Sequence, residues 1–261
     1  MNYKTNPVVS LSVIILAKNE QDNIKECIES VRGWADEVIV VDDESTDETV
    51  SIAKSLGAKV LQRKMDIEGR QRNWAYAQAR NEWVLSLDAD ERLTEALKEE
   101  IEAVIKAPGD FVAFSIPLRN YIGSYWVRYG GWYPAGKVRL FRKDKFKYEE
   151  ARVHPRVFIQ GRCGHLKKDI IHKGYPDFSH FLNSLNYQTT QEAKKWIEIG
   201  RKMSFFYALW RAIDRFFRTY IYKKGYRDGF IGFMVATFAS LYQILSYAKY
   251  REFKNISTKS A

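Results

Sequence analysis

The sequence predicts an α/β fold with an open, mostly parallel sheet, followed by a helical, membrane-associating tail. Three observations support this fold class. Apolar, strand-like runs alternate with amphipathic segments through the first 90 residues or so, as in a parallel α/β sheet. Acidic residues follow three of the four predicted strands at the ends that a parallel sheet places together. Almost all of the net positive charge lies in residues 186–261.

The first half of the predicted sheet is built from two buried strands and two helices. Leu11–Leu16 is a continuous apolar run rich in β-branched residues, which is typical of a strand buried on both faces. In Asn23–Val31 apolar residues recur every three or four positions, which predicts an amphipathic helix. Glu37–Val41 is a second buried strand. The next predicted helix, Thr49–Leu56, ends at Gly57, a residue favoured just beyond a helix.

The alternation continues and then changes. Ala58–Leu61 is a third short strand, Arg70–Arg80 a helix and Trp83–Leu87 a fourth strand. A Gly- and aromatic-rich loop covers 121–136, and the chain reads as helix after about Pro176. The shorter strand-like runs after Phe111 are Phe111–Ile116, Val138–Phe141 and Val153–Ile159. We expect two domains, residues 1–185 and 186–261.

Charge and cysteine content exclude several classes of protein. The chain has a net charge of +10, and residues 186–261 hold 14 Lys and Arg against 5 Asp and Glu. This polarised charge favours a tail that faces an anionic membrane surface over a uniformly basic nucleic-acid binder. An RNA-binding protein remains an alternative reading of the basic and aromatic tail. The two cysteines, Cys27 and Cys163, support neither a disulfide framework nor a zinc ribbon.

The acidic strand ends predict a polar pocket. The acidic residues that follow the first, second and fourth strands are, in that order, Glu20; Asp42, Asp43 and Glu44; and Asp88, Asp90 and Glu91. Because the carboxyl ends of parallel strands meet at one sheet edge, we expect these carboxylates to converge. The alternative is that polar residues follow strands simply because the chain turns there.

The D-x-D element Asp88-Ala89-Asp90 is the sharpest of these signals. Two carboxylates that flank one residue can share Mg²⁺ or Mn²⁺, which also accepts phosphate oxygens and offsets the charge of a diphosphate leaving group. No G-x-G-x-x-G and no Walker A loop follows a strand, which argues against NAD and against a P-loop. Arg70 and Arg72 could meet phosphate instead, or could form the solvated start of a helix.

Several segments together resemble family 2 glycosyltransferases of the GT-A type. They are VSLSVIILAKNEQDNIKECIESV, EVIVVDDESTDET and WVLSLDADER, in that order. The later segments resemble the bacterial branch that contains lipopolysaccharide-core glucosyltransferases. These segments are GGWYPAGKVRLFRKDKFKY, IIHKGY and the tail GYRDGFIGFMVATFASLYQILSYAKYRE. The resemblance spans nearly the whole chain and implies a GT-A catalytic domain.

The resemblance also implies a role for each matching residue in binding a nucleotide-sugar. Glu20, with Asp42 or Asp43, would contact the nucleoside of the donor. Asp88 would act in catalysis near the ribose and the diphosphate. The metal ligands would be Asp90 and His172, although a polar residue that ends a short strand is the alternative for His172.

The resemblance does not identify the catalytic base directly. Related sequences often have an acidic residue directly after the histidine that corresponds to His154, where this chain has Pro155. The candidate carboxylates are Glu149, Glu150 and Asp177, and we favour Glu150 as the base that deprotonates the acceptor hydroxyl.

Aromatic residues stand out in the loop and in the tail. Trp126, Trp132 and Tyr133 suit either an acceptor-binding loop or a plain aromatic core. Residues 196–222 mix aromatics with Lys and Arg, as an interfacial helix does. Residues 229–248 contain no charged side chain. We favour a monotopic, partly embedded hairpin over a membrane span or a tail packed on the protein or on a dimer partner.

We therefore predict an inverting, metal-dependent glycosyltransferase on the cytoplasmic face of the cell membrane. It would move a sugar from a nucleotide-sugar, UDP-linked in our prediction, to a lipopolysaccharide-core or other lipid-linked acceptor, with no nucleic-acid partner. A polyprenyl-phosphate sugar transferase and a non-catalytic, membrane-associated nucleotide-binding scaffold are the alternatives. The sugar, the linkage and the oligomeric state stay open.

Overall fold

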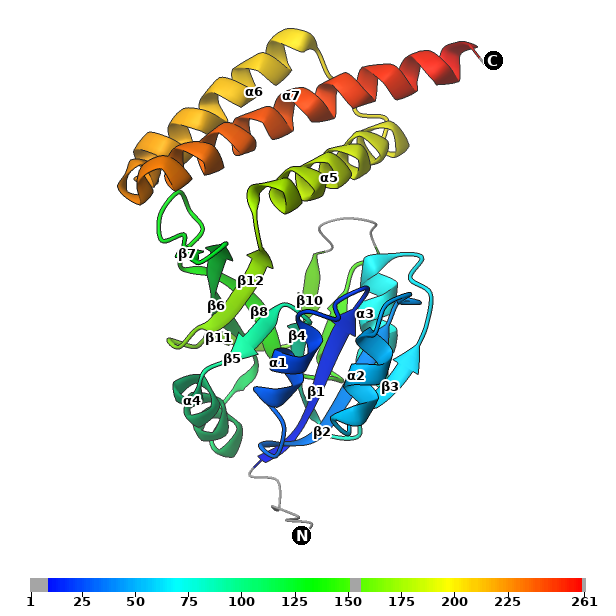
Figure 1. Cartoon of the computed structure of the whole chain (residues 1–261), viewed down its shortest axis with the longest axis vertical. Helices are drawn as coiled ribbons and strands as arrows, with labels where there is room; N and C mark the ends of the chain where they lie inside the picture. The colour runs from blue at the N-terminus through cyan, green and yellow to red at the C-terminus, as the bar shows by residue number, and fades with distance from the viewer. Residues whose placement is uncertain (1–8, 151–155, 260–261) are drawn as a thin grey trace. The chain divides into compact units, whose positions relative to one another are not determined.

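The computed structural model describes residues 9–150 and 156–259 (Figure 1). It separates into two compact units. The first consists of Met1–Leu118 and Gly136–His172, and the second of Arg119–Ala135 and Lys173–Ala261. The expected boundary between residues 185 and 186 falls inside one continuous helix, α5 (Phe178–Glu198).

The first unit is built on a mixed sheet in which neighbouring strands follow the order β3-β2-β1-β4-β8-β6-β12-β5. The parallel strands predicted from the sequence form its first half, and β8 then pairs antiparallel with β4. The bounds of the strands of this half are β1 Val9–Ala17, β2 Ala35–Asp42, β3 Lys59–Gln62, β4 Trp83–Asp88 and β8 Ala135–Arg142. This mixed α/β architecture confirms the predicted fold class.

The second half of the sheet contains strands that the sequence only partly indicated. Their bounds are β5 Glu91–Leu93, β6 Phe111–Ile122, β7 Tyr125–Trp126, β11 Arg162–His165 and β12 Ile170–Tyr175. A separate antiparallel pair joins β9 (Phe146–Tyr148) to β10 (Val157–Ile159). Of the strand expected at 153–159, residues 153–155 lie outside the described residues.

Both faces of the parallel strands are covered, which explains their continuous apolar composition. On β1, Val13 and Ile15 point to one face of the sheet, whereas Ile14 points to the other. The face of Val13 packs against α1 (Ile24–Glu29), α2 (Thr49–Ser55) and α4 (Glu95–Lys106). The opposite face packs against α3 (Glu68–Ala77).

Helix α4 had no counterpart among the predicted elements. The Thr94 side chain caps it by accepting a hydrogen bond from the Leu97 backbone N–H at 3.2 Å. Leu97 and Ile101, spaced four residues apart, are fully buried against the sheet. An N-cap followed by this spacing is a sequence signal for a helix.

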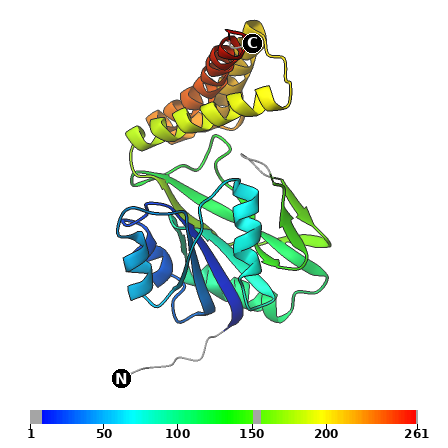
Figure 2. The same cartoon turned by 90° about the vertical axis from the view of Figure 1, so that its right-hand side faces the viewer.

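The second unit is mainly helical, as expected after Pro176. Its helical elements are α5, α6 (Phe205–Phe217), the π-helical turn η1 (Arg218–Tyr222), the 3₁₀ turn η2 (Gly225–Asp228) and α7 (Gly229–Lys259). Helix α7 packs along both α5 and α6 (Figure 1, Figure 2). Gly232 has to lack a side chain, because a Cβ there would lie 1.8 Å from the Gly225 carbonyl oxygen.

Trp132 belongs to the apolar core of the second unit. Its ring meets Tyr175 and Phe181 at centroid distances of 6.0 and 5.8 Å. The core reading of the aromatic loop therefore holds for Trp132. Trp126 has different neighbours, which are described below.

Candidate active site

The register of the parallel strands places three carboxylates around the end of β1. Leu16 pairs with Asp88 of β4, and Ala17 pairs with Asp42 of β2. The chain then leaves β1 and reaches Glu20, whose backbone N–H donates to Thr49 Oγ1 at 2.7 Å. Strand ends from both sides of β1 thus share one edge of the sheet, as their parallel direction requires.

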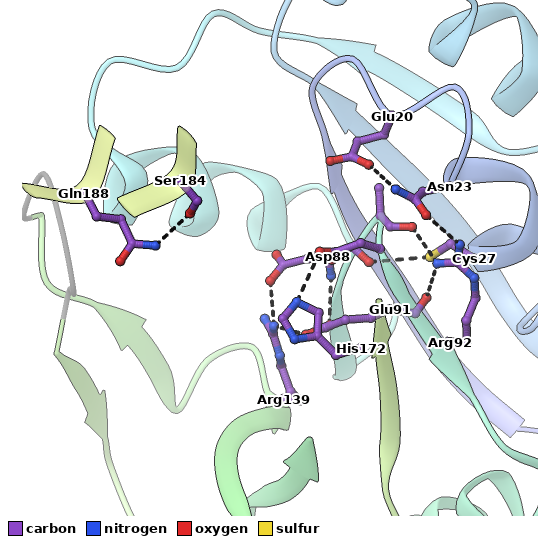
Figure 3. A network of polar contacts seen from close by, with 12 residues as sticks. Glu20, Asn23, Cys27, Asp88, Glu91, Arg92, Arg139, His172, Ser184 and Gln188 are labelled. Carbon is purple, nitrogen blue, oxygen red and sulfur yellow. Dashed lines mark hydrogen bonds and ion pairs between the residues drawn. The ribbon is translucent and has the colours of Figure 1, made fainter. Parts of the chain in front are cut away.

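Asp88 lies between two arginines. Its Oδ2 accepts a hydrogen bond from Arg139 Nη2 at 2.6 Å, and its Oδ1 accepts one from Arg72 Nη2 at 3.0 Å (Figure 3 shows the Arg139 side). Burial alone would raise the pKa of the Asp88 carboxyl, but the Arg139 and Arg72 guanidiniums outweigh burial and hold that pKa well below its usual range. Asp88 is therefore anionic at neutral pH.

Glu91 completes a buried charge network behind Asp88. Its Oε2 accepts a hydrogen bond from the Asp88 backbone N–H at 3.0 Å, and its Oε1 pairs with Arg139. Glu91 is fully buried and Arg139 is 1% exposed. Burial raises the pKa of Glu91 even though Arg139 opposes the shift. Arg139 thus fixes Asp88 and Glu91 together.

Sequence analysis named Glu91 only as one of the acidic residues after the fourth strand, and it did not single out Arg139. A signal for Arg139 existed, because it interrupts the apolar run Val138–Phe141. A charged residue inside a buried strand is rarely without a buried partner. The identity of that partner depends on the antiparallel pairing of β8 with β4, which the local sequence does not encode.

Asp90 and His172 meet at the same edge. His172 Nε2 lies 3.1 Å from Asp90 Oδ2, and both side chains are about one-fifth exposed (Figure 3 labels His172). Burial lowers the pKa of His172, but the hydrogen bond to Asp90 and the charges of Asp90 and Glu91 outweigh burial and raise it. The pairing of His172 with Glu91 across β12 and β5 positions the imidazole.

These two hydrogen-bonded side chains could serve as neighbouring ligands of a divalent ion. In an octahedral site with ligands about 2.1 Å from the ion, adjacent ligand atoms lie about 3 Å apart. This matches the separation of His172 Nε2 and Asp90 Oδ2. Among the described residues, no cluster of three or more His, Cys, Asp and Glu side chains is arranged to hold a metal ion. An ion here would therefore take its other ligands from water or from a phosphate-bearing substrate.

Glu20 faces the same cluster. Burial raises the pKa of the Glu20 carboxyl, Asn23 lowers it through a 2.8 Å hydrogen bond, and the charges of Asp90 and Asp88 raise it further. The net shift is upward. The Glu20 carboxylate is therefore close enough to Asp88 and Asp90 to be repelled by both. A cation bound among these three carboxylates would be stabilised by all of them.

Asp42 is fully buried and only half satisfied. Its Oδ2 accepts from the Ser45 backbone N–H at 3.0 Å and from Gln62 Nε2 at 3.3 Å. Its Oδ1 has no hydrogen-bond partner in the structure. A buried carboxylate oxygen without a donor calls for an explanation, and a ligand N–H would supply one. Asp42 is thus equipped to recognise a hydrogen-bond donor.

Asp43 differs from Asp42 in having both oxygens engaged. Its Oδ2 pairs with Lys18 Nζ at 2.8 Å, and its Oδ1 accepts from the Met65 backbone N–H at 2.7 Å. These contacts tie the loops after β1 and β3 together. Asp43 therefore joins these loops, whereas Asp42 keeps a buried oxygen without a hydrogen-bond partner.

Arg72 and Arg70 lie in different surroundings although both belong to α3. Arg72 donates to Glu68 and Asp88 at 3.0 Å each, while its buried Nη1 has no partner in the structure. Arg70 is exposed and pairs with Asp66 and Glu150. Of these two arginines, Arg72 alone contacts the carboxylate cluster. Its unused Nη1 donor is suited to a phosphate oxygen.

Comparison with known proteins identifies the family. Residues 12–173 match the model of glycosyl transferase family 2, which is more than half of the chain. The chain belongs to glycosyltransferase family 2. An uncharacterized glycosyltransferase of Rickettsia typhi is 31% identical over 255 residues, covering 93% of this chain and 87% of that protein. The resemblance noted in the sequence is thereby confirmed, and the protein is a transferase.

A second relative and a solved structure extend the comparison. The lipopolysaccharide core biosynthesis glycosyltransferase LpsC of Rhizobium meliloti is 28% identical, covering 93% of this chain and 92% of that protein. Glucosyl-3-phosphoglycerate synthase from Mycobacterium tuberculosis, solved with phosphoglyceric acid, superposes with a TM-score of 0.50 at 16% identity. The match covers 75% of this glycosyltransferase and 81% of that chain, and it shows a shared fold.

Each carboxylate considered as the catalytic base of this glycosyltransferase has a partner outside the D-x-D cluster. Glu150 pairs with Arg70 at 3.2 Å, and Glu149 pairs with Arg156 at 2.7 Å. Asp177 caps α5 by accepting from the His180 N–H at 2.6 Å. The segment with His154 and Pro155 lies outside the described residues.

Proposed function

We propose that the protein transfers a sugar from a UDP-sugar, with inversion, to a lipopolysaccharide-core or other lipid-linked glycan. The single observation that carries this proposal is the meeting of Asp90 and His172 beside Asp88, with Glu20 and Asp42 at the same sheet edge. A polyprenyl phosphate as acceptor is the alternative within the same chemistry.

The preference for uracil rests on Asp42. Its free Oδ1 can accept one N–H, and uracil presents one imide N–H on its pairing edge. Guanine presents two adjacent donors and would need both oxygens of the carboxylate. Asp42 Oδ2 already accepts two hydrogen bonds. One open acceptor therefore suits a uridine nucleotide better than a guanosine nucleotide.

The diphosphate would be held from two sides. Asp90 and His172 would hold Mg²⁺ or Mn²⁺, which when bound offsets the negative charge that develops on the departing diphosphate. Arg72 would donate its unused Nη1 to a phosphate oxygen. Asp88, kept anionic by Arg139 and Arg72, would orient the ribose hydroxyls as a hydrogen-bond acceptor.

Glu150 remains our proposed base. Glu149 and Glu150 line a cavity of about 850 Å³ together with Asn73 and Tyr148. The Arg72 guanidinium lies 5.6 Å from the centre of the Tyr148 ring, so this cavity adjoins the residue that binds Asp88. For Glu150 to accept a proton from an acceptor hydroxyl, its ion pair with exposed Arg70 has to open.

We propose that α6 provides the surface that binds the membrane. Phe206, Trp210, Ile213 and Phe217 follow one another at four-, three- and four-residue steps and are 80%, 59%, 51% and 53% exposed. Such a stripe on one face of a helix, with basic residues around it, is typical of insertion into the membrane interface. Helix α7 is long and apolar enough to cross a membrane, but one third of its apolar stretch is buried against the protein. We therefore favour interfacial binding at the cytoplasmic surface over a span.

A donor panel tests this function. UDP-glucose, UDP-galactose, UDP-N-acetylglucosamine and GDP-mannose are incubated with the full chain and Mn²⁺ or Mg²⁺, and nucleoside diphosphate release is measured. We expect slow release of UDP from at least one UDP-sugar, and its loss when the ion is chelated. Release from none of the donors by folded protein would refute the proposal.

A further inference from the structure

A second cavity, of about 620 Å³, lies within the second unit. Its walls come from the turn between β6 and β7, from the loop after β7 and from η2. The lining residues are Tyr121, Ser124, Tyr125, Trp126, Arg128, Tyr129, Arg227 and Asp228. Its volume is in the range of small-molecule binding sites, and its walls combine aromatic rings with hydroxyl and guanidinium groups.

Trp126, in the wall of this cavity, has cationic neighbours over its ring and an indole N–H without a partner. The guanidiniums of Arg119 and Arg128 lie 4.7 and 4.5 Å from its ring centre, and Tyr133 meets it edge-on at 5.2 Å. Cations over the ring fix the indole in place. Its Nε1–H is buried and has no hydrogen-bond partner in the structure. Because buried donors are nearly always satisfied, a ligand oxygen is the natural partner.

Asp228 organises the floor of the cavity. It is 4% exposed and accepts hydrogen bonds from the Tyr125 hydroxyl at 3.1 Å and from the Arg128 and Tyr129 backbone N–H groups at 3.1 and 2.8 Å. These three bonds fix the loop that carries the aromatic rings. The carboxylate is thereby committed to the protein and turned away from solvent.

The cations of the cavity remain accessible. Arg128 is exposed, and Arg227 lies over the Tyr129 ring at 5.5 Å and hydrogen-bonds to Tyr129 and Tyr226. A guanidinium has five N–H donors, so these contacts leave donors for a ligand. A molecule that enters from solvent meets two guanidiniums and aromatic faces before it meets the buried carboxylate.

We propose that this cavity binds an anionic saccharide, a sugar unit that carries a phosphate or a carboxylate. The arginines Arg128 and Arg227 would pair with the anion as charge-assisted donors. The ring of Tyr125 would contact a C–H face of the sugar, and the Trp126 N–H would donate to a hydroxyl oxygen. That the saccharide is part of the acceptor rests on the proposed function; that it binds here does not.

Titration calorimetry of the full chain with four probes tests the binding chemistry. The probes are glucose 6-phosphate, glucuronate, neutral glucose and inorganic phosphate. We expect at least one anionic sugar to bind more tightly than both glucose and phosphate. Glucose binding as tightly as the anionic sugars would overturn the need for charge, and phosphate binding as tightly would overturn the need for a sugar.

Variants locate the site. In Arg128→Gln/Arg227→Gln the affinity for the anionic sugar should fall about tenfold or more, the loss expected for charge-assisted hydrogen bonds. Trp126→Phe keeps an aromatic face but removes the N–H, and should also weaken binding. Arg32→Gln, an exposed arginine in the first unit, is the control and should bind as the wild type does. Unchanged affinity in both the double variant and Trp126→Phe would overturn the proposal.

UDP release by the wild-type chain, measured on the same preparation, separates the two proposals. Donor hydrolysis without binding of an anionic sugar refutes the saccharide site and leaves the proposed function standing. Binding without hydrolysis of any donor supports the saccharide site and counts against the proposed function. Circular dichroism of each variant establishes that it is folded.

Discussion

His172 and Asp90 are 82 residues apart in the sequence, yet His172 Nε2 lies 3.1 Å from Asp90 Oδ2. The two residues are joined by strand pairing, because His172 stands opposite Glu91 across β12 and β5 and Asp90 directly precedes Glu91. Pairing of backbone strands is a rigid way to hold two side chains at ligand spacing. The candidate metal position therefore combines a side chain on β12 with one in the two-residue turn between β4 and β5.

Replacing Asp42 by Asn tests the recognition of the base. The amide keeps the size of the side chain but removes its charge, and if its NH₂ faces the base it opposes the imide N–H instead of accepting from it. We expect KM for the UDP-sugar to rise about tenfold or more, as for a lost hydrogen bond to a charged group, with a smaller change in kcat. Steady-state kinetics of UDP release measures both constants.

Asp110→Asn is the matched control, since the Asp110 carboxylate is 82% exposed and pairs only loosely with Arg162 at 3.4 Å. Its KM should equal that of the wild type. If Asp42→Asn also left KM unchanged, the open Oδ1 would have no role in binding the donor.

Replacing Arg139 by Met tests the buried charge network. Met fills similar space but leaves Glu91 without its cation and Asp88 with Arg72 alone. Breaking a buried pair by removing one partner costs about 3–5 kcal/mol. We expect the free energy of unfolding in urea to fall by about that amount. A loss below about 1 kcal/mol, the range of surface pairs, would contradict the account.

The parts of the fold that the sequence predicted are those with a local signal. The strands β1, β2 and β4 have continuous apolar composition because both faces are covered, and the acidic residues that follow them necessarily share an edge. Helix α4 had an equally local signal in its Thr94 cap and was overlooked. The second half of the sheet was only partly indicated, because antiparallel strands from distant segments complete it.

The candidate site shows the same division. The convergence of Glu20, Asp42 and Asp88 follows from strand direction, whereas the place of His172 came from the family resemblance alone. Arg139 was missed because its partners lie on other strands. Asp43 and Asp42 look alike in the sequence, and only the structure shows that one is saturated by Lys18 and Met65 while the other keeps an open oxygen.

The free energy of unfolding should depend on pH because the pKa of Asp88 is lowered in the folded state. The folded state holds the pKa of Asp88 well below its usual value of about 4, so the carboxylate contributes stability above that value. This contribution is lost as the pH falls through the folded pKa. We expect Asp88→Asn to be less stable than the wild type in urea at pH 6, by an amount that persists to about pH 4 and narrows below it. A difference that is already gone at pH 5 would contradict the depressed pKa.

Removing the exposed aromatics of α6 should weaken membrane binding. In Phe206→Ser/Trp210→Ser/Phe217→Ser, each substitution removes burial worth about 1.5–3 kcal/mol, or about ten- to a hundredfold in partitioning. We expect co-sedimentation with vesicles of phosphatidylglycerol and phosphatidylethanolamine to be lost. Phe158→Ser, on the first unit, removes an aromatic that is 52% exposed and should not affect it. Undiminished binding of the triple variant would exclude α6 as the membrane face.

The most direct measurement of the central claim is Mn²⁺ binding in the presence of UDP, followed by electron paramagnetic resonance of the free ion. The wild type should bind one Mn²⁺ when UDP is present. Asp90→Asn and His172→Gln should each weaken that binding by at least about tenfold, since even outer-shell partners of a metal contribute that much, whereas Asp110→Asn should bind as the wild type does. If both Asp90→Asn and His172→Gln bound Mn²⁺ as tightly as the wild type, the ion would lie elsewhere and the proposed active site would be wrong.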